Sequence, residues 1–257
     1  MMSLYLQTVF MLFLCGIVSA ASIHIERDSQ RQDHGILSFI TTKDTISAYS
    51  FSATNQRLVV IDEGDTSPRY GNLKKALTQN SCSAGVNGGF FKDDATHSPM
   101  GLLISHGQMI SPLAQQGFTA AGVLYDTGHE IKLERRQLLS TPIAQMKQAV
   151  QSGPFLVENK KIVSSLNNKV RDRRTFVATD GRGNWVIGIS SALTLRELAE
   201  WLASSPPQLG VEVRHALNLD GGSSSSFADR ESGRYHASFK QVRNYLGVTP
   251  GGAGKAH

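Results

Sequence analysis

Charged residues are missing from the start of the chain, because no lysine, arginine, aspartate or glutamate precedes Glu26. Within this opening, residues 9–18 form an apolar run, and Val18-Ser19-Ala20 supplies small or apolar residues suited to signal-peptidase cleavage. The run is short for spanning about 30 Å of hydrocarbon. We therefore expect residues 1–21 to be a secretory signal peptide and the protein to be secreted or periplasmic. No stable membrane insertion is expected after cleavage; an uncleaved anchor is the alternative.

Cysteine is scarce, with only Cys15 and Cys82 in 257 residues. Removal of the signal peptide leaves Cys82 alone, which excludes an intramolecular disulfide and requires the core to stabilise the fold. A single cysteine before an apolar strand is typical of a packed thiol rather than a nucleophile. No cysteine–histidine cluster has the spacing of a zinc site.

Aromatic residues are also few, at 7% of the chain, and they do not alternate with basic residues. The net charge is +5 and the pI is about 9.3. The positive charges are spread along the chain rather than clustered, and no aromatic residues alternate with them, which argues against nucleic-acid binding. The mild basic excess suits an anionic partner such as a sugar phosphate or phosphoglycan.

Long helical patterns are rare, and most of the chain alternates as strands do. Helices are predicted at residues 71–79, from Thr141-Pro142 to about Gln151, and at residues 194–203, where Thr194 and Glu197 form a capping box. Strands are predicted at residues 22–27, 35–42, 46–52, 57–61, 84–87, 100–105, 108–111, 119–125, 130–133, 175–179, 185–190, 215–220 and 243–248. The fold class is α+β: mostly β, with mixed or antiparallel sheet and a few packed helices in one domain, residues 22–249. We expect the glycine-rich tail, residues 250–257, to be disordered.

The segment His215 to Ser226 is the most informative part of the chain. Alternation places Leu217 and Leu219 on one face of a strand, and Asn218 and Asp220 on the other. Asp220 then enters the loop Gly221-Gly222-Ser223, whose N–H groups and hydroxyl suit an anion such as phosphate. A carboxylate beside an anion site favours chemistry on a phosphorylated substrate; the alternative is a flexible Gly/Ser linker.

A second strand ends in the same way, at Asn87-Gly88-Gly89. Asn-Gly is also a strong hairpin signal, so an isolated type I′ turn is the alternative. Two such strand ends, more than a hundred residues apart, suggest two walls of one site.

Seven short motifs, in order, make the sequence similar to the phosphodiester glycosidase family. That family includes the enzyme that uncovers mannose-6-phosphate on lysosomal proteins. The motifs are residues 86–91, 99–101, 153–154, 173–175, 193–199, 217–223 and 243–248, within a motif core of residues 84–248. One departure is Ser223, where the family often has a third glycine. The segment before residue 84 matches no motif of the family.

The resemblance implies hydrolysis of the C–O bond between a sugar and a phosphodiester, giving free sugar and a phosphomonoester. Asp220 is the candidate nucleophile or base, Arg174 the candidate phosphate clamp and Asn87 a further catalytic candidate. Candidate substrate or phosphate contacts are Gly88, Gly89, Thr175, Asn218, Gly221, Gly222, Ser223 and Asn244. No cofactor is expected, although Asp220 is a conceivable ligand of a divalent cation.

Other interpretations stay open at this point. Arg171, Arg173 and Arg174 form a solvated charge run in the alternative interpretation. A second catalytic carboxylate is open among Asp93, Asp94, Asp172 and Asp180, and His97 is a lower-ranked candidate. The competing functions are a phosphodiesterase that cuts the P–O bond and a non-catalytic module that binds phosphoglycans.

Overall fold

The computed structural model describes residues 36–40, 45–65 and 68–250. The expected signal peptide, the expected strand at residues 22–27 and residues 251–257 of the expected tail lie outside this part of the chain. Pro250 was expected in the tail, but it ends a strand and pairs with Gln56. None of the described helices is long and apolar enough to cross a membrane.

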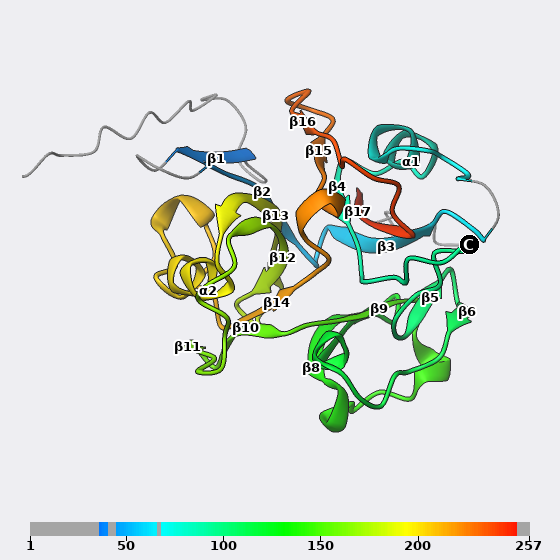
Figure 1. The fold of residues 1–257 in the computed structure, drawn as a ribbon, viewed down its shortest axis with the longest axis horizontal. Coiled ribbons are helices and arrows are strands. Elements are labelled where there is room, and N and C mark those ends of the chain that lie inside the picture. The colour runs from blue at the N-terminus through cyan, green and yellow to red at the C-terminus, as the bar shows by residue number, and fades with distance from the viewer. Residues whose placement is uncertain (1–35, 41–44, 66–67, 251–257) are drawn as a thin grey trace, which may run out of the picture.

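Three antiparallel sheets make up most of the described structure, which confirms the mostly β, α+β prediction (Figure 1). The first has the strand order β1(Ile36–Ile40), β2(Thr45–Ser52), β13(Asn184–Leu193), β12(Asp172–Thr179), β14(His215–Asn218), β10(Phe155–Glu158), β11(Lys161–Ile162). The second has β16(Tyr235–His236), β15(Phe227–Asp229), β4(Ala84–Asn87), β17(Asn244–Pro250), β3(Gln56–Asp62). The third has β6(Gln108–Ser111), β5(Leu103–Ser105), β9(Gln148–Ser152), β7(Gly122–Asp126), β8(Ile131–Arg135).

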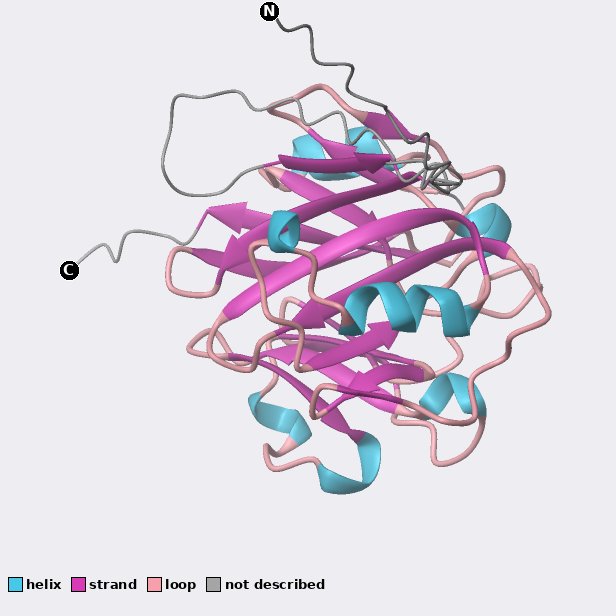
Figure 2. Cartoon of the chain, turned by 90° about the vertical axis from the view of Figure 1, so that its left-hand side faces the viewer, coloured by secondary structure: helices cyan, strands magenta, loops and turns pink. Residues whose placement is uncertain are grey.

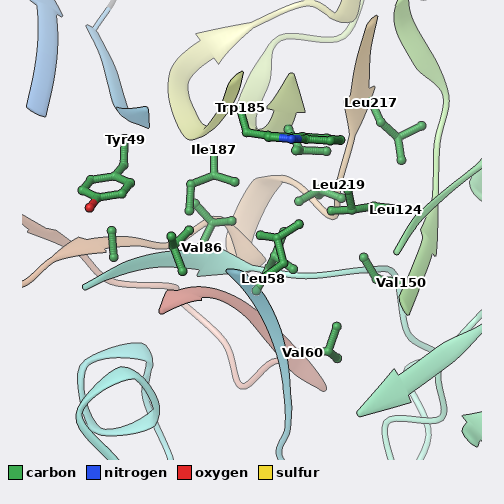
Figure 3. Close-up of a cluster of buried hydrophobic side chains, with 14 of the residues drawn as sticks. Tyr49, Leu58, Val60, Val86, Leu124, Val150, Trp185, Ile187, Leu217 and Leu219 are labelled. Carbon is green, nitrogen blue, oxygen red and sulfur yellow. The ribbon is translucent and has the colours of Figure 1, made fainter. Parts of the chain in front are cut away.

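The main hydrophobic core lies where these sheets face one another. Trp185 and Leu217 project from the first sheet, Val86 and Leu58 from the second, and Val150 from the third (Figure 3). All five are buried. Packing between sheets explains why the chain is stable without a disulfide among the described residues, where Cys82 is a free, buried thiol.

Two helices cover the outer faces of the first two sheets (Figures 1 and 2). Helix α2(Leu195–Ala203) packs Leu198, Ala199 and Leu202 against the first sheet. Its predicted capping box is present, with reciprocal bonds between Thr194 and Glu197. Helix α1(Leu73–Gln79) packs Leu77 and its neighbours on the second sheet. Short 3₁₀ turns lie at residues 118–120, 136–138, 143–145, 207–209 and 222–224.

The predicted helix from Thr141 to about Gln151 was wrong. Only a single 3₁₀ turn forms, and residues 148–152 are the central strand β9, buried along its whole length. Thr141-Pro142 resembles the start of a helix, but Pro142 precedes only the 3₁₀ turn Ile143–Gln145. Gln148 and Gln151 are both buried in the sheet because their amides bond to backbone groups: Gln148 Oε1 accepts from Val60 N at 3.0 Å, and Gln151 Oε1 accepts from Leu102 N at 2.9 Å.

Candidate active site at the junction of two sheets

Asp220 lies where the first and second sheets meet. It follows β14 of the first sheet, and its N–H donates to the Gly88 carbonyl, just beyond β4 of the second sheet, at 3.1 Å. Burial raises the pKa of the Asp220 carboxyl, an effect offset in part by the Ser224 hydroxyl, the charge of Lys240 and the Gly221 N–H. Asp220 is therefore a half-buried acid whose proton is held more tightly than that of a solvated aspartate.

Asn87 joins the two sheets around Asp220. Its Nδ2 donates to the Asp220 carbonyl at 2.7 Å, and its Oδ1 accepts from Thr175 Oγ1 at 2.8 Å and Ser226 N at 3.0 Å. The side chain is only 1% exposed. Asn87 and the equally buried Thr175 thus hold the backbone that presents Asp220. The polar atoms of both side chains are therefore bonded to other groups of the protein.

Gly88 and Gly89 turn toward Asn244, at the start of β17. Gly88 N donates to the Asn244 carbonyl and Gly89 N donates to Asn244 Oδ1, both at 2.9 Å. These N–H groups are therefore engaged within the protein and are not open donors for phosphate. A Cβ on Gly88 would lie 1.9 Å from Asn244 Oδ1, which explains the need for glycine there.

The loop from Gly221 to Ser226 has open donors instead. The N–H groups of Gly222 and Ser223 have no acceptor within the described part of the chain, and Ser223 is exposed. Gly222 has φ of +63°, a conformation that side chains disfavour, and a Cβ there would meet Asp172 Oδ2 at 2.8 Å. The sequence prediction of a special Gly-Gly turn after Asp220 agrees with this geometry.

Several side chains around this junction are buried and yet incompletely bonded. Asn218 donates through Nδ2 to the Gly153 carbonyl at 3.0 Å, but its Oδ1 has no hydrogen-bond partner in the described structure. The same is true of Ser226 Oγ and Asn244 Nδ2. A buried polar atom without a partner costs about 1–3 kcal/mol. These three atoms lie on segments that adjoin Asp220 or are bonded to Asn87 and Gly89, which indicates a region able to bind further polar groups.

Arg173 and Arg174 are half-buried rather than solvated. Arg174 runs beside Gly221 and donates to the carbonyls of Leu193 at 3.0 Å and Val170 at 2.7 Å. No carboxylate within the described residues forms an ion pair with it. Burial lowers the pKa of both guanidinium groups. Arg174 therefore brings a positive charge that forms no ion pair, although the Asp172 carboxylate acts on it from nearby and raises its pKa against the effect of burial.

Arg173 has a different task, since it ties two loops together. It donates to the carbonyls of Ser225 and Ala237, and its guanidinium stacks on the Phe239 ring at 5.0 Å. Arg171, the third arginine, is exposed and pairs with Glu197 at the start of α2. The basic run thus separates into one surface residue, one loop clamp and one cation beside the Gly-Gly turn.

Lys240 is a charged neighbour of Asp220 that no sequence pattern had indicated. Its N–H donates to the Ser223 carbonyl at 3.3 Å, and its Nζ lies 4.6 Å from the centre of the Phe91 ring. His97 packs against the same ring in a T-shaped arrangement, with 5.2 Å between the ring centres. The residues just after Gly88-Gly89 therefore lie next to the Asp220 loop.

The four carboxylates held open as second catalytic acids are placed differently. Asp94 accepts bonds from Thr96 N and Ser98 N, which hold its pKa at about 2, and Asp180 accepts bonds within its own hairpin turn. Asp93 is exposed. Asp172 alone among the four contacts the space beside Gly222.

A divalent cation would require several oxygen ligands around Asp220. Within the described ranges, no group of three or more histidine, cysteine, aspartate or glutamate side chains is placed to hold a metal ion. The site combines one half-buried acid of raised pKa, open N–H donors, and two cations that form no ion pair within the described residues, Arg174 and Lys240. That combination suits a substrate with one reacting centre next to an anion.

Comparison with known structures shows that the fold has relatives. The catalytic domain of zebrafish N-acetylglucosamine-1-phosphodiester alpha-N-acetylglucosaminidase, auto-inhibited by its pro-peptide, superimposes with a TM-score of 0.57 at 13% identity, over 90% of this chain and 87% of that one. A hypothetical protein from Synechocystis gives 0.51 at 16% identity, over 84% and 61%. A Burkholderia pseudomallei protein described as exported gives 0.52 at 12%, over 83% and 74%. At these identities the likeness shows the fold alone.

Comparison with curated proteins finds no match. The phosphodiester glycosidase family model, in contrast, matches residues 80–249. That segment contains Asn87, Arg174 and Asp220, together with the loops that surround them. Because the match spans more than half of the sequence, this chain belongs to the phosphodiester glycosidase family.

Proposed function

We propose that the protein hydrolyses the glycosidic C–O bond of a sugar-1-phosphodiester, releasing free sugar and a phosphomonoester. The observation that supports this most is the position of Asp220: a half-buried acid beside the open N–H groups of the Gly222 turn and the unpaired charge of Arg174. Family membership supports the same reaction class.

The chemistry requires little beyond these groups. The C1–O bond breaks with its electron pair leaving on the phosphate oxygen, and a water oxygen becomes bonded to C1. Since a phosphomonoester has its second pKa near 6, it leaves readily without a strong general acid. Asp220, once ionised, attacks C1 or takes a proton from the attacking water, while the positive charge at C1 develops as in other glycoside hydrolysis.

Arg174 and the turn donors bind the phosphate in this proposal. A guanidinium presents a planar pair of N–H donors that matches two phosphate oxygens. Two carbonyls already fix the orientation of the Arg174 side chain. Less side-chain entropy is therefore lost when the substrate binds. Asn87, Thr175 and Asn244 act by positioning Asp220 and the two glycines rather than by contacting the reacting atoms. Asn218 Oδ1 and the Ser223 hydroxyl form hydrogen bonds with polar groups of the sugar or the phosphate in this proposal.

The proposed substrate is a cell-envelope or phosphoglycan diester outside the cytoplasm. The uncharged, apolar start of the sequence supports export. The likeness to a bacterial protein described as exported points in the same direction.

The test incubates the purified protein with an N-acetylglucosamine-α-phosphate alkyl diester, followed by proton and phosphorus NMR in H₂¹⁸O. We expect free sugar and phosphomonoester, with ¹⁸O in the sugar. Asp220→Asn should lower the rate by about 10²–10⁴-fold while the fold is kept. Asp93→Asn, which alters an exposed carboxylate, is the matched control and should keep the parental rate.

Three outcomes would contradict the proposal. Incorporation of ¹⁸O into phosphate would assign the protein to P–O cleavage. Binding of the diester without turnover, retained in Asp220→Asn, would make it a binding module. A near-normal rate in Asp220→Asn would remove Asp220 from the reaction, and Asp172→Asn would then identify whether the neighbouring carboxylate acts instead.

A further inference from the structure

Lys240 is held against the Asp220 loop by its own backbone. Phe239 N and Lys240 N both donate to the Ser223 carbonyl, at 2.7 and 3.3 Å. The Arg173 guanidinium clamps the same segment through the Ala237 carbonyl and the Phe239 ring. The position of Lys240 relative to the Gly-Gly turn is therefore set by several contacts of the backbone and of neighbouring side chains.

The ammonium group is also oriented. Nζ lies 4.6 Å from the centre of the Phe91 ring, whose face attracts a cation. Phe91 is half-buried and packs on the hydrophobic cluster under α1, so it is a firm support. A lysine on a free surface loop would have no such preferred direction.

The charge of Lys240 is not neutralised by a salt bridge. No carboxylate within the described residues lies within ion-pair distance of Nζ, and the acid whose charge it influences is Asp220. A surface lysine is ordinarily solvated or paired. This one is held over an aromatic ring, near enough to the half-buried Asp220 for its charge to act on that carboxyl.

The reaction under consideration changes the charge of the leaving group. A phosphodiester has one negative charge, and its oxygen gains a second as the C1–O bond breaks. A cation at that position binds the transition state more tightly than the substrate, which is the condition for raising kcat. Arg174 runs beside Gly221, and the Lys240 backbone is bonded to the carbonyl of Ser223 in the same loop, so both cations adjoin the Gly221-Gly222 turn.

We propose that Lys240 is a second phosphate-binding residue of this site, which contacts a non-bridging phosphate oxygen and stabilises the charge that develops on the leaving phosphomonoester. The inference rests on the proposed function for its catalytic part, whereas the binding of a phosphate group by Lys240 stands on its own.

The first measurement is phosphate binding, which needs no turnover. Calorimetric titration with inorganic phosphate should give a dissociation constant about fivefold higher in Lys240→Met than in the parent, while Lys240→Arg stays close to the parent. The matched control is Lys74→Met. Lys74 is an exposed residue of α1, and its Nζ lies 4.4 Å from the centre of the Tyr235 ring on β16. The variant therefore removes another exposed lysine that packs over an aromatic ring, in a part of the fold away from Asp220. It should bind phosphate as the parent does.

The second measurement separates a phosphate contact from a structural role. With the alkyl diester, Lys240→Met should lower kcat by about 10–100-fold, with a smaller rise in KM, because the second charge appears only in the transition state. Lys240→Arg should recover most of that loss. Unchanged unfolding curves in all variants show that the exposed side chain is not needed for folding.

The third readout is the acidic limb of the kcat/KM profile. Asp220 must be ionised, so activity falls as pH drops through its raised pKa. Loss of the Lys240 charge should move that limb to higher pH. Arg174 beside Gly221, Asp172 beside Gly222 and His97 on the Phe91 ring are the other charged or titratable groups around this loop, and all remain in place.

The outcomes are distinguishable from failure of the proposed function. If the diester is not hydrolysed but phosphate binding weakens in Lys240→Met alone, the phosphate contact stands and the reaction does not. If phosphate binding and both kinetic readouts are unchanged in Lys240→Met, the lysine is only a solvated surface charge and the inference is overturned. An equal loss in Lys74→Met would overturn it as well, since the effect would then be one of net charge.

Discussion

The Asn87 side chain makes three hydrogen bonds with two distant segments, the loop from Asp220 to Ser226 and strand β12 at Thr175. Ser226 N and the Asp220 carbonyl are main-chain groups in a buried setting, and Thr175 is 0% exposed. Replacing the amide therefore removes a hydrogen-bond partner from several buried polar groups at once.

We expect Asn87→Ala to lower the free energy of unfolding by about 3 kcal/mol, because each buried group left unpaired costs about 1–3 kcal/mol. The diester activity should fall with it, as Asp220 loses its support. Urea denaturation measures the change. Asn55→Ala, at an exposed turn residue, is the control and should stay within about 0.5 kcal/mol of the parent. A loss below about 1 kcal/mol in Asn87→Ala would show that the network is not a stability determinant.

At this scale the sequence predicted part of the site. Asp220 and the Gly-Gly turn could be located because a strand pattern ended there, and the arginine because it belonged to a family motif. The engaged N–H groups of Gly88 and Gly89 could not be foreseen, because their acceptor, Asn244, lies 155 residues away. Lys240 gave no signal, since its significance comes from Phe91 and Ser223 in space rather than from its neighbours in sequence.

Helix α2 shows how a local sequence signal becomes a packed element. Thr194 Oγ1 accepts from Glu197 N at 3.1 Å, and Glu197 Oε2 accepts from Thr194 N at 2.8 Å. The helix covers the first sheet on the face away from the main core. A change that weakens this helix should therefore lower the stability of the protein without altering the candidate site.

Thr194→Ala should lower the free energy of unfolding by about 1 kcal/mol, the typical effect of removing an N-cap hydroxyl. Thr194→Ser keeps the hydroxyl and should remain near the parent. Thermal unfolding and diester turnover, measured side by side, check this: the melting temperature should fall in the alanine variant while kcat stays constant. Equal stability of the alanine and serine variants would show that the capping bond contributes nothing.

Elements were predictable where the signal was local. Helix α2 and the hairpins at residues 103–111 and 172–193 follow from capping and turn residues. Strand β9 was mistaken for helix because the acceptors and donors that satisfy Gln148 and Gln151 come from other parts of the chain. Short strands such as β11 and β16, two residues each, have too few positions to show any period.

The stability of the whole molecule should depend on two partly buried histidines. Burial, with Arg214 next in effect, lowers the pKa of His215, and Glu158 opposes the shift. Burial also lowers the pKa of His236, with Arg173 and Arg234 adding to the effect, and its Nε2 lies 3.0 Å from Ser47 Oγ. Both side chains therefore resist protonation in the folded state.

The sign of the pH effect follows from linkage. As pH falls below about 6.5, the unfolded chain takes up protons on these histidines before the folded protein does, so folding becomes less stable. We expect the free energy of unfolding to be lower at pH 5.5 than at pH 7.5. In the double variant His215→Gln/His236→Gln, this difference should shrink. Urea denaturation at both pH values measures it, and an identical pH dependence in the parent and the double variant would contradict the assignment.

The strand order of the second sheet has a consequence for how the protein is made. β17 lies between β3 and β4, although both are synthesised long before it. Until residues 244–250 have been synthesised, β3 and β4 each have one edge whose backbone N–H and C=O groups lack their partner strand. The nascent chain must keep both edges from pairing wrongly until β17 has been supplied, so Asn87, Asp220 and Asn244 can be brought together only after residue 244 has been synthesised.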